Sequence, residues 1–376
     1  MEHTTPDALD VLVIGAGQSG LAIGWHLARQ RRRFVIVDAA PSLGHAWRTR
    51  WDSLRLFSPA EHDNLPGMAF PAPAGTYPTK DQVADYLTCY ADRFQLPVLL
   101  GHQVTRLTHH PEAPHARFTV HTSHGPLRAR QVVVATGAFQ RPSIPDVAGR
   151  FDGAVVQLHS AQYRNAGQLP DGPVLVVGAG NSGLQIAEEL ATATDHRDVH
   201  LAVGSRPTQL PQRVLGRDLF WWLTRTGAIS KPATSMLARR FRARGDLVIG
   251  TSRQRVADLG VTLRPRLADA TAAGAVFADG SRLQPSAVVW ATGYTPDYSW
   301  LDVPGAFPTD DTARGALPAH ERGVSPVAGL FFLGLPWQHT RGSALLGFVG
   351  QDAAWLAGRI GAAAPDSVAG PGPIRA

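Results

Sequence analysis

Two glycine-rich turns of the same design lie far apart in this chain, and they constrain its fold more than any other feature. The first turn spans Gly15–Gly20 and the second spans Gly178–Gly183, an offset of 178 − 15 = 163 residues. Each follows an apolar, β-branched run and precedes an amphipathic stretch, which is the order that a strand, a tight turn and a helix require. The sequence therefore predicts an α/β protein with two Rossmann-like units.

Both turns have the G-x-G-x-x-G spacing of dinucleotide-binding sites. The first glycine permits the sharp bend, the second lets the backbone approach a pyrophosphate, and the third lets the helix pack against its strand. The unpaired amides and positive dipole of the helix start then face the phosphates. Either turn alone could be an ordinary strand-to-helix connection. Two such turns, each with a predicted strand before it and a predicted helix after it, favour one site for a flavin and one for a nicotinamide. The expected contacts are Gly15, Gly17, Gln18, Ser19 and Gly20 for the flavin, and Gly178, Gly180, Asn181, Ser182 and Gly183 for the nicotinamide.

The residues that follow each turn assign the two cofactors. Asp38 ends the next strand, 38 − 15 = 23 residues beyond Gly15, where a carboxylate accepts hydrogen bonds from ribose hydroxyls. This suits FAD, whose adenosine ribose has a free 2′-hydroxyl. The matching strand of the second unit has no acid at its end and runs into Arg206, whose guanidinium can bind a 2′-phosphate. The pattern favours NADPH over NADH, although Arg206 could also be a solvated surface arginine.

Composition narrows the class of protein. A chain of 376 residues with 44% hydrophobic and 18% charged residues has room for two or three globular domains. The lone cysteine, Cys89, excludes an internal disulfide framework and the paired-cysteine centre of disulfide reductases. No apolar run has membrane-spanning length and no basic-then-apolar leader is present. We expect a cytoplasmic enzyme without a transmembrane segment, a nucleic-acid partner or a metal site.

The order of strands predicts one domain interrupted by another. Two buried strands, 131–134 and 287–290, each stop in an Ala-Thr-Gly turn, as suits a chain that crosses between domains. A small meander is expected over 104–130, and a helix over 81–94 with capping residues around Thr79. The predicted division is 8–141 for the first part of an FAD domain, 142–284 for an NADPH domain, 285–365 for the second part of the FAD domain and 366–376 for a flexible tail. The expected architecture is the three-layer ββα/βα type.

Two later segments leave alternatives open. A buried strand over 329–334 precedes a helix expected from Gly342 to about Ile360, whose start could face the pyrimidine side of the flavin or belong to an ordinary core. The run from Arg213 to Arg244 combines aromatic and basic residues. It could be a lid, a dimer surface or a membrane-surface contact, or its aromatic residues could pack against their own domain.

These motifs resemble the flavin-containing monooxygenases, in particular the compact bacterial members, from Val11 to about Ile360. The first and second turns resemble the family's FAD and NADPH turns, and Gly44-x-x-Trp47 resembles its flavin-side tryptophan segment. The stretch from Phe151 through His159 to Tyr163 resembles a family motif, but five residues instead of three separate Gly153 from His159. The two extra residues could form a bulge that leaves His159 in place, or could displace it.

The resemblance implies further contacts and a reaction. FAD contacts are expected at Asp38, Trp47, Val104, Thr136, Gly137, Gly342 and Ser343, and NADP contacts at His159, Arg206, Thr292 and Gly293. His159 is expected to orient the linker and NADP⁺ rather than transfer a proton. Asn64 resembles an asparagine beside the flavin that binds the peroxide, although it could be a plain turn residue.

The implied activity is an NADPH-dependent FAD monooxygenase. Hydride from NADPH reduces the flavin, O₂ adds to form a C4a-(hydro)peroxyflavin, and one oxygen atom passes to a small substrate. Two alternatives stay open: a flavin reductase or oxidase without substrate oxygenation, and a non-catalytic FAD and NADP(H) redox sensor. The expected partners are a small molecule and O₂, with a homodimer as a possibility.

Overall fold

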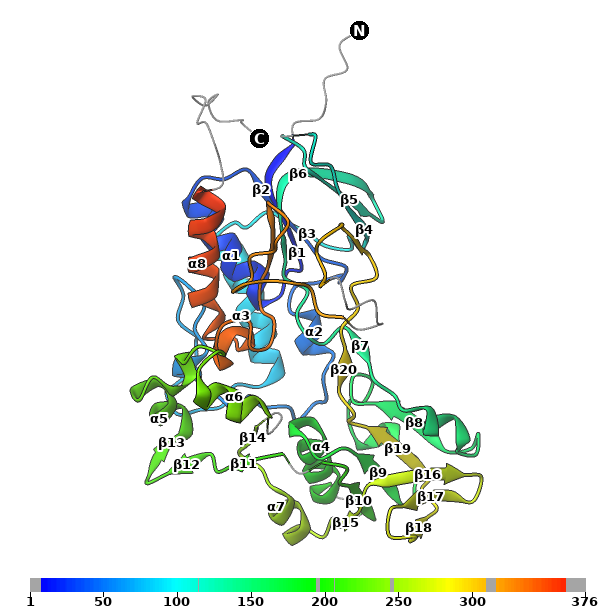
Figure 1. The fold of residues 1–376 in the computed structure, drawn as a ribbon. Coiled ribbons are helices and arrows are strands. Elements are labelled where there is room, and N and C mark those ends of the chain that lie inside the picture. The colour runs from blue at the N-terminus through cyan, green and yellow to red at the C-terminus, as the bar shows by residue number, and fades with distance from the viewer. Residues whose placement is uncertain are drawn as a thin grey trace.

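The computed structural model describes residues 8–113, 115–193, 197–205, 207–243, 247–308 and 316–362, which form two sheet-based units. The first unit contains both the N-terminal and the C-terminal elements, blue and red in the upper half of Figure 1. The second unit, mostly green and yellow, is built from the middle of the chain (Figure 1). The predicted α/β class with two Rossmann-type sheets is confirmed.

The first sheet has eight strands in the order β21-β4-β5-β6-β1-β2-β3, with β22 also paired to β6. These strands are β1 (Leu9–Ile14), β2 (Phe34–Val37), β3 (Val98–Leu99), β4 (Val104–His109), β5 (Phe118–Thr122), β6 (Gly125–Val134), β21 (Leu301–Asp302) and β22 (Leu330–Phe332). The first half of β6 is antiparallel to β5, and its second half runs parallel to β1 and β22. The last strand of the predicted meander and the predicted buried strand 131–134 are therefore one continuous strand.

Both faces of this sheet are covered, so consecutive residues of β1 are all buried although their side chains point to opposite sides. Val11 and Val13 pack with α1 (Gln18–Arg29), α3 (Lys80–Arg93) and α8 (Val349–Ala362) on one face. Leu12 and Ile14 pack on the other face, against side chains of the β4–β5 hairpin and of residues 298–307. The result is a three-layer unit.

The second sheet has five parallel strands in the order β15-β10-β9-β19-β8. They are β8 (Val156–His159), β9 (Val174–Val177), β10 (Val199–Ala202), β15 (Thr262–Arg264) and β19 (Ala287–Trp290). Helices α4 (Asn181–Thr192) and α7 (Arg253–Asp258) cover one face. The small antiparallel sheet of β16 (Leu267–Thr271), β17 (Gly274–Phe277) and β18 (Arg282–Leu283) covers the other.

Two short strands carry the chain between the units. β7 (Arg141–Pro142) and β20 (Tyr294–Thr295) pair antiparallel, and Figure 1 shows them between the upper and lower halves. The predicted division put the return to the FAD domain at residue 285, before β19. In the structure β19 is central to the second sheet, so the chain returns only after Gly293. The division into an FAD and an NADPH domain stays a prediction, and its tail 366–376 lies outside the described residues.

Two predicted helices have different outcomes. The predicted helix with capping residues around Thr79 is present as α3, and Thr79 forms a capping box with Gln82. The helix predicted from Gly342 is wrong in its start, because Arg341–Ala344 (η5) is a separate 3₁₀ turn and α8 begins at Val349. Thr340 and Ser343 form a capping box that closes this single turn, and Leu345 then adopts an extended backbone.

Residues 211–243, called here the inserted segment, lie between β11 (Gln209–Leu210) and β14 (Val248–Ile249). The segment contains β12 (Arg213–Val214), β13 (Arg217–Asp218), α5 (Leu219–Arg225), η4 (Ala228–Ser230) and α6 (Met236–Ala243). Phe220 is buried against Phe57 and Phe348 of the first unit, so this aromatic residue packs between the units rather than only within its own.

The remaining short elements are α2 (His45–Arg48), η1 (Ala60–His62), η2 (Asp146–Arg150) and η3 (Ala166–Gln168). Across the ranges that the structure describes, no helix combines the length and apolar character needed to cross a membrane.

We predict that Gly183→Ala lowers the free energy of unfolding by about 3 kcal/mol, because a Cβ there overlaps the carbonyl oxygen of Gly178. Gly180→Ala is the matched control: its Cβ has no neighbouring atom within 4 Å, so the loss should stay below about 1 kcal/mol. Urea unfolding of both variants measures the difference. Equal losses would contradict this packing of α4 on its turn.

Candidate functional site

The two turns have nearly identical backbone geometry. Gly15 has φ +106° and Gly178 has φ +113°, a region that side chains avoid. A Cβ on Gly15 would lie 2.5 Å from the carbonyl oxygen of Ala135, and one on Gly178 would overlap the carbonyl oxygen of Ala291. The first glycine of each turn therefore lies directly against the point where the chain leaves its sheet.

The second glycine of each turn leaves room on the opposite side of the turn. A Cβ on Gly17 or Gly180 would meet no protein atom within 4 Å. These residues are the N-caps of α1 and α4, and neither helix has a side-chain cap. The backbone amides in the first helical turn of α1 and of α4 are thus left for another partner, and such helix starts bind phosphate. Both sites fit a dinucleotide pyrophosphate.

Asp38 lies beside the first turn at the end of β2. Its Oδ2 accepts a hydrogen bond of 2.6 Å from the backbone N–H of Ala16, and its Oδ1 accepts one of 2.8 Å from Ala40. The backbone N–H of His102 donates to the carbonyl oxygen of Asp38 at 2.8 Å, which brings Val104, two residues further on, to the same end of the sheet. The structure thus brings together Asp38, Val104 and the first turn.

The segment around η5 also contacts the first turn. The Gln18 side chain donates to the carbonyl oxygen of Ala344 at 2.9 Å, and Ser19 is buried against Gly334. Ser343 accepts hydrogen bonds from the backbone N–H groups of Thr340 and His339. The predicted residues Gly342 and Ser343 are therefore held close to the first turn, although no helix starts there.

The second turn is tied to β14. Asn181 donates from its side-chain amide to the carbonyl oxygen of Leu247 at 2.8 Å, and its Oδ1 accepts from the N–H of Ile249 at 3.2 Å. Arg206 lies outside the described residues. The aliphatic part of the Arg266 side chain lies next to Gly204, just beyond the end of β10. Sequence spacing does not reveal Arg266 because it comes from the loop between β15 and β16, about 60 residues further along the chain.

His159 lies at the end of β8, in register with Trp290 of β19, and is only 1% exposed. Its Nδ1 accepts from the N–H of Ala161 at 3.1 Å, so Nε2 carries the proton and donates to the carbonyl oxygen of Gly293 at 3.0 Å. Burial lowers the pKa of His159. The stretch between Gly153 and His159 begins with a turn, in which the N–H of Val155 donates to the carbonyl oxygen of Asp152 at 3.0 Å, and β8 then runs in register with β19 up to His159.

Arg50 joins the segment after α2 to both crossings of the chain. Its guanidinium carbon lies 5.4 Å from the ring centroids of Phe139 and Tyr294, and it hydrogen-bonds the Tyr294 hydroxyl. Trp47, three residues earlier, is half-buried against the main core. Nothing in the sequence marks Arg50, because both of its partners are distant along the chain.

The remaining predicted residues of the crossings lie close to this contact. The Thr136 hydroxyl accepts from the Gln140 side chain at 2.9 Å, and Gln140 also donates to the carbonyl oxygen of Gly137. Thr292 donates from its hydroxyl to the carbonyl oxygen of Ser143. The predicted contacts of both cofactors at the two crossings are thus part of one hydrogen-bonded linker region.

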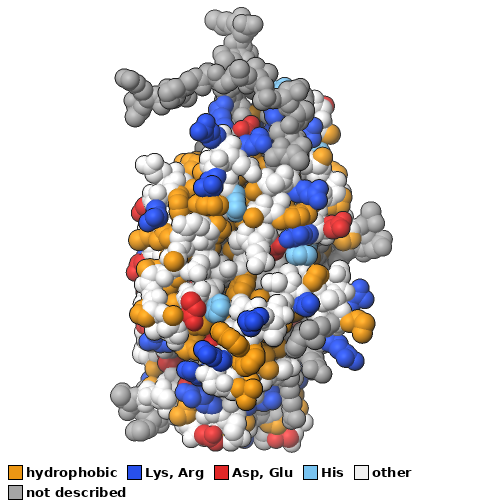
Figure 2. Space-filling model, turned by 90° about the vertical axis from the view of Figure 1, so that its left-hand side faces the viewer, with side chains coloured by type: hydrophobic (Ala, Val, Ile, Leu, Met, Phe, Trp, Pro, Cys, Tyr) orange, Lys and Arg blue, Asp and Glu red, His pale blue; other side chains and the backbone are white. Residues whose placement is uncertain are grey.

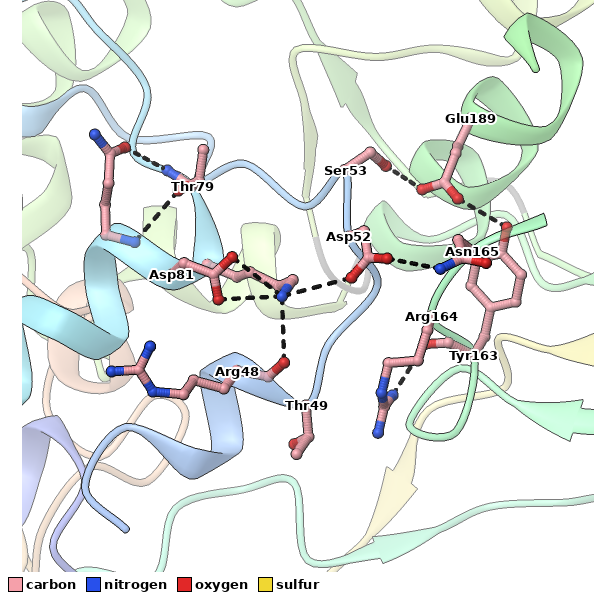
Figure 3. A network of polar contacts seen from close by, with 12 residues as sticks. Arg48, Thr49, Asp52, Ser53, Thr79, Asp81, Tyr163, Arg164, Asn165 and Glu189 are labelled. Carbon is pink, nitrogen blue, oxygen red and sulfur yellow. Dashed lines mark hydrogen bonds and ion pairs between the residues drawn. The ribbon is translucent and has the colours of Figure 1, made fainter. Parts of the chain in front are cut away.

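Figure 3 shows a polar network that joins the units. The Lys80 ammonium lies 3.1 Å from Asp81 and 3.6 Å from Asp52, whose other oxygen accepts from Asn165 at 2.7 Å. The Tyr163 hydroxyl donates to Glu189 at 2.9 Å, and Glu189 also accepts from Ser53 (Figure 3). Burial is the main cause of the raised pKa of Tyr163, and the negative charge of Glu189 raises it further.

Asn64 and its neighbour Asp63 have opposite surroundings. Asn64 is exposed and closes its own turn, donating to the carbonyl oxygen of Glu61 and accepting from the N–H of Phe70. Its catalytic role stays a prediction. Asp63 is 1% exposed, Ser58 donates to its Oδ1 at 2.6 Å, and its Oδ2 has no partner. Burial raises the pKa of Asp63 to about 7, which its sequence does not reveal.

A cavity of about 710 Å³ lies between residues 232–234 of the inserted segment and α8. Its lining includes Arg322, Gln338 and Trp355 but none of the residues predicted to contact a cofactor.

We predict that the stability of the wild type falls as pH drops below about 6.5, the ordinary pKa of histidine, in part because the folded state holds His159 neutral. The pKa of His159 is lower in the folded state than in the unfolded state. Its contribution to the free energy of unfolding is therefore present above about pH 6.5 and is lost as the pH falls through the folded-state pKa. His159→Asn should show a flatter pH dependence in urea unfolding. Parallel curves for the two proteins would contradict a neutral His159.

Comparisons with known proteins agree with the geometry. Residues 12–212 match the family model described as pyridine nucleotide-disulphide oxidoreductase. An uncharacterized CzcO-like oxidoreductase of Geobacillus kaustophilus is 43% identical over 93% of this chain and 97% of its own length. Indole-3-pyruvate monooxygenase YUCCA8 of Oryza sativa is 30% identical over 80% of this chain and 79% of its own length.

A solved structure extends the similarity to the whole fold. The flavin-containing monooxygenase of Stenotrophomonas maltophilia is 31% identical, covers 95% of this chain and 99% of its own, and superimposes with a TM-score of 0.75. One assignment follows from the matching geometry of the two glycine turns, the linker held by His159 and the similarity over 95% of this chain. The chain belongs to the flavin-containing monooxygenases, within the pyridine nucleotide-disulphide oxidoreductase family.

Proposed function

We propose that this protein is an NADPH-dependent FAD monooxygenase that transfers one oxygen atom of O₂ to a small organic or soft-heteroatom substrate. The observation that carries the proposal is the pair of turns with open second glycines and uncapped helix starts on one chain. The chain has a single cysteine, and the proposed reaction uses no pair of cysteines.

The first turn would hold FAD. The open side of Gly17 and the start of α1 suit the pyrophosphate, and Asp38 suits the ribose hydroxyls. Trp47, Thr136 and Gly137, together with the η5 segment that Gln18 contacts, would surround the ring system. Bound FAD would accept hydride from the nicotinamide and react with O₂, while the protein supplies positioning and excludes water.

The second turn would hold NADPH. Gly180 and Ser182 at the start of α4 suit the pyrophosphate, and Arg206 together with Arg266 would select a 2′-phosphate. Thr292 and Gly293 lie where the chain returns to the first unit. His159 donates to Gly293 and is held neutral, which suits a role in positioning the linker rather than in proton transfer. We also propose a cytoplasmic location, with a homodimer left open.

Oxygen transfer is tested with FAD-loaded protein, NADPH and ¹⁸O₂. We expect NADPH oxidation coupled to a product that carries one labelled atom, from a panel of sulfides, amines, ketones and α-keto acids. Hydrogen peroxide equal to the NADPH consumed on every substrate would favour the reductase or oxidase alternative. No consumption of NADPH at all would favour the redox sensor.

Two single substitutions separate the cofactor sites in the same assay. Gly17→Ala fills the open side of the first turn and should yield protein with little bound FAD. Gly180→Ala should retain yellow FAD but raise the KM for NADPH at least about tenfold, because a methyl group meets the pyrophosphate. The reverse pattern would contradict the assignment of FAD to the first turn and NADPH to the second.

A further inference from the structure

The inserted segment carries the whole formal net charge of the chain. It contains one acidic residue, Asp218, and seven basic ones: Arg213, Arg217, Arg225, Lys231, Arg239, Arg240 and Arg242. Its net charge is 7 − 1 = +6, and that of the chain is 36 − 30 = +6. The rest of the chain thus has 29 basic and 29 acidic residues and is formally neutral.

The positive charge of this segment is left exposed. All seven basic side chains are exposed, and none of them forms an ion pair within the described residues. Asp218 is half-buried and accepts hydrogen bonds from Tyr77 of the first unit and from Gln212 and the N–H of Phe220 within the segment. The single acid therefore does not neutralise the outer side of the segment.

Large apolar side chains lie among these charges. Leu215 is 86% exposed, Met236 is 78% exposed and Trp221 is 36% exposed. They come from three different elements: the β12–β13 turn, the start of α6 and α5. Figure 2 views the side on which α5 and α6 lie, and its lower half shows hydrophobic and basic side chains mixed together.

Leu215 is the least expected of these residues. It occupies the two-residue turn between β12 and β13 with φ +48°, followed by Gly216 with φ +75°. Hairpin turns of this backbone favour Asn-Gly, and a leucine there is both strained and unburied. Folding alone gives no reason for it. Arg213 and Arg217 lie two residues before and two residues after Leu215 in this hairpin.

The opposite side of the segment is fixed to the body of the protein. The Phe220 ring lies 6.0 Å from Phe57 and 6.1 Å from Phe348, and Gln212 donates to the carbonyl oxygen of Phe57 at 2.9 Å. The outer side is therefore presented on a packed support rather than on a loose loop. It is this outer side that needs a partner.

We propose that the inserted segment docks this protein on an anionic lipid surface, with Leu215, Trp221 and Met236 entering the headgroup region. Seven cations attract anionic lipid, and exposed apolar side chains on separate elements can enter the interface together. Contacts to nucleic-acid phosphates would use the cations but leave Leu215 and Met236 without a role. α5 and α6 are far too short to span a bilayer, so the contact is peripheral. The proposal does not depend on the proposed oxygenation.

The test is flotation of the full-length, FAD-loaded protein with phosphatidylcholine vesicles, with and without phosphatidylglycerol. We expect binding only when phosphatidylglycerol is present, weakening with salt. Arg239→Gln, Arg240→Gln and Arg242→Gln combined should reduce binding at least about tenfold. The matched control combines Arg31→Gln, Arg128→Gln and Arg282→Gln, which are exposed outside the segment, and should bind like the wild type.

A second variant separates lipid from other polyanions. Leu215→Ser with Trp221→Ser keeps every charge and should still reduce vesicle binding several-fold, with binding to heparin unchanged. Normal FAD content and NADPH oxidation would show that the variants are folded. Equal binding of this variant and the wild type to anionic vesicles would overturn the proposal, as would equal binding of the wild type to neutral vesicles.

Discussion

The close approach of each glycine turn to the crossing of the chain is the contact on which the rest of the structure depends. Gly15 lies against the carbonyl oxygen of Ala135, and Gly178 lies against that of Ala291, with no space for a Cβ at either position. The crossings begin at these alanines and pair with each other as β7 and β20. The glycine turns of both units are thus joined directly to the linker between them.

Three further sets of contacts orient the second unit on the first. His159 and Arg50 hold the crossings, the polar network joins Lys80 and Asp52 to Asn165, and the Phe220 ring packs on Phe57. Hydride transfer needs two rings in contact at a defined angle, and small misplacements cost large factors in rate. Placement of NADPH against FAD would therefore depend on these contacts between the units as well as on the two glycine turns.

The sequence predicts the local parts of this arrangement well. The two turns and the cap at Thr79 follow from residue types at short spacing, where glycine conformation and capping chemistry decide the outcome. The start of α8 was wrong because Thr340 and Ser343 close a turn of their own, which competes with a helix from Gly342. The crossing was placed before β19 because a buried strand does not reveal which sheet it joins.

Contacts between distant segments could not be predicted. Arg50 meets Tyr294, Lys80 meets Asp52 and Arg266 approaches Gly204 only because the fold brings them together. The burial of Asp63 beside exposed Asn64 likewise depends on packing against Gly347, far along the chain. In each case a single sequence shows the residue type but not its neighbours.

The central claim, that one chain places NADPH against FAD, is tested most directly by anaerobic mixing of the FAD-loaded protein with NADPH. The account predicts bleaching of the flavin in a single turnover, slowed by a primary isotope effect when the transferred hydrogen of NADPH is deuterium. Flavin that stays yellow under these conditions, or bleaching that is insensitive to deuterium and equally fast in Gly180→Ala, would contradict it.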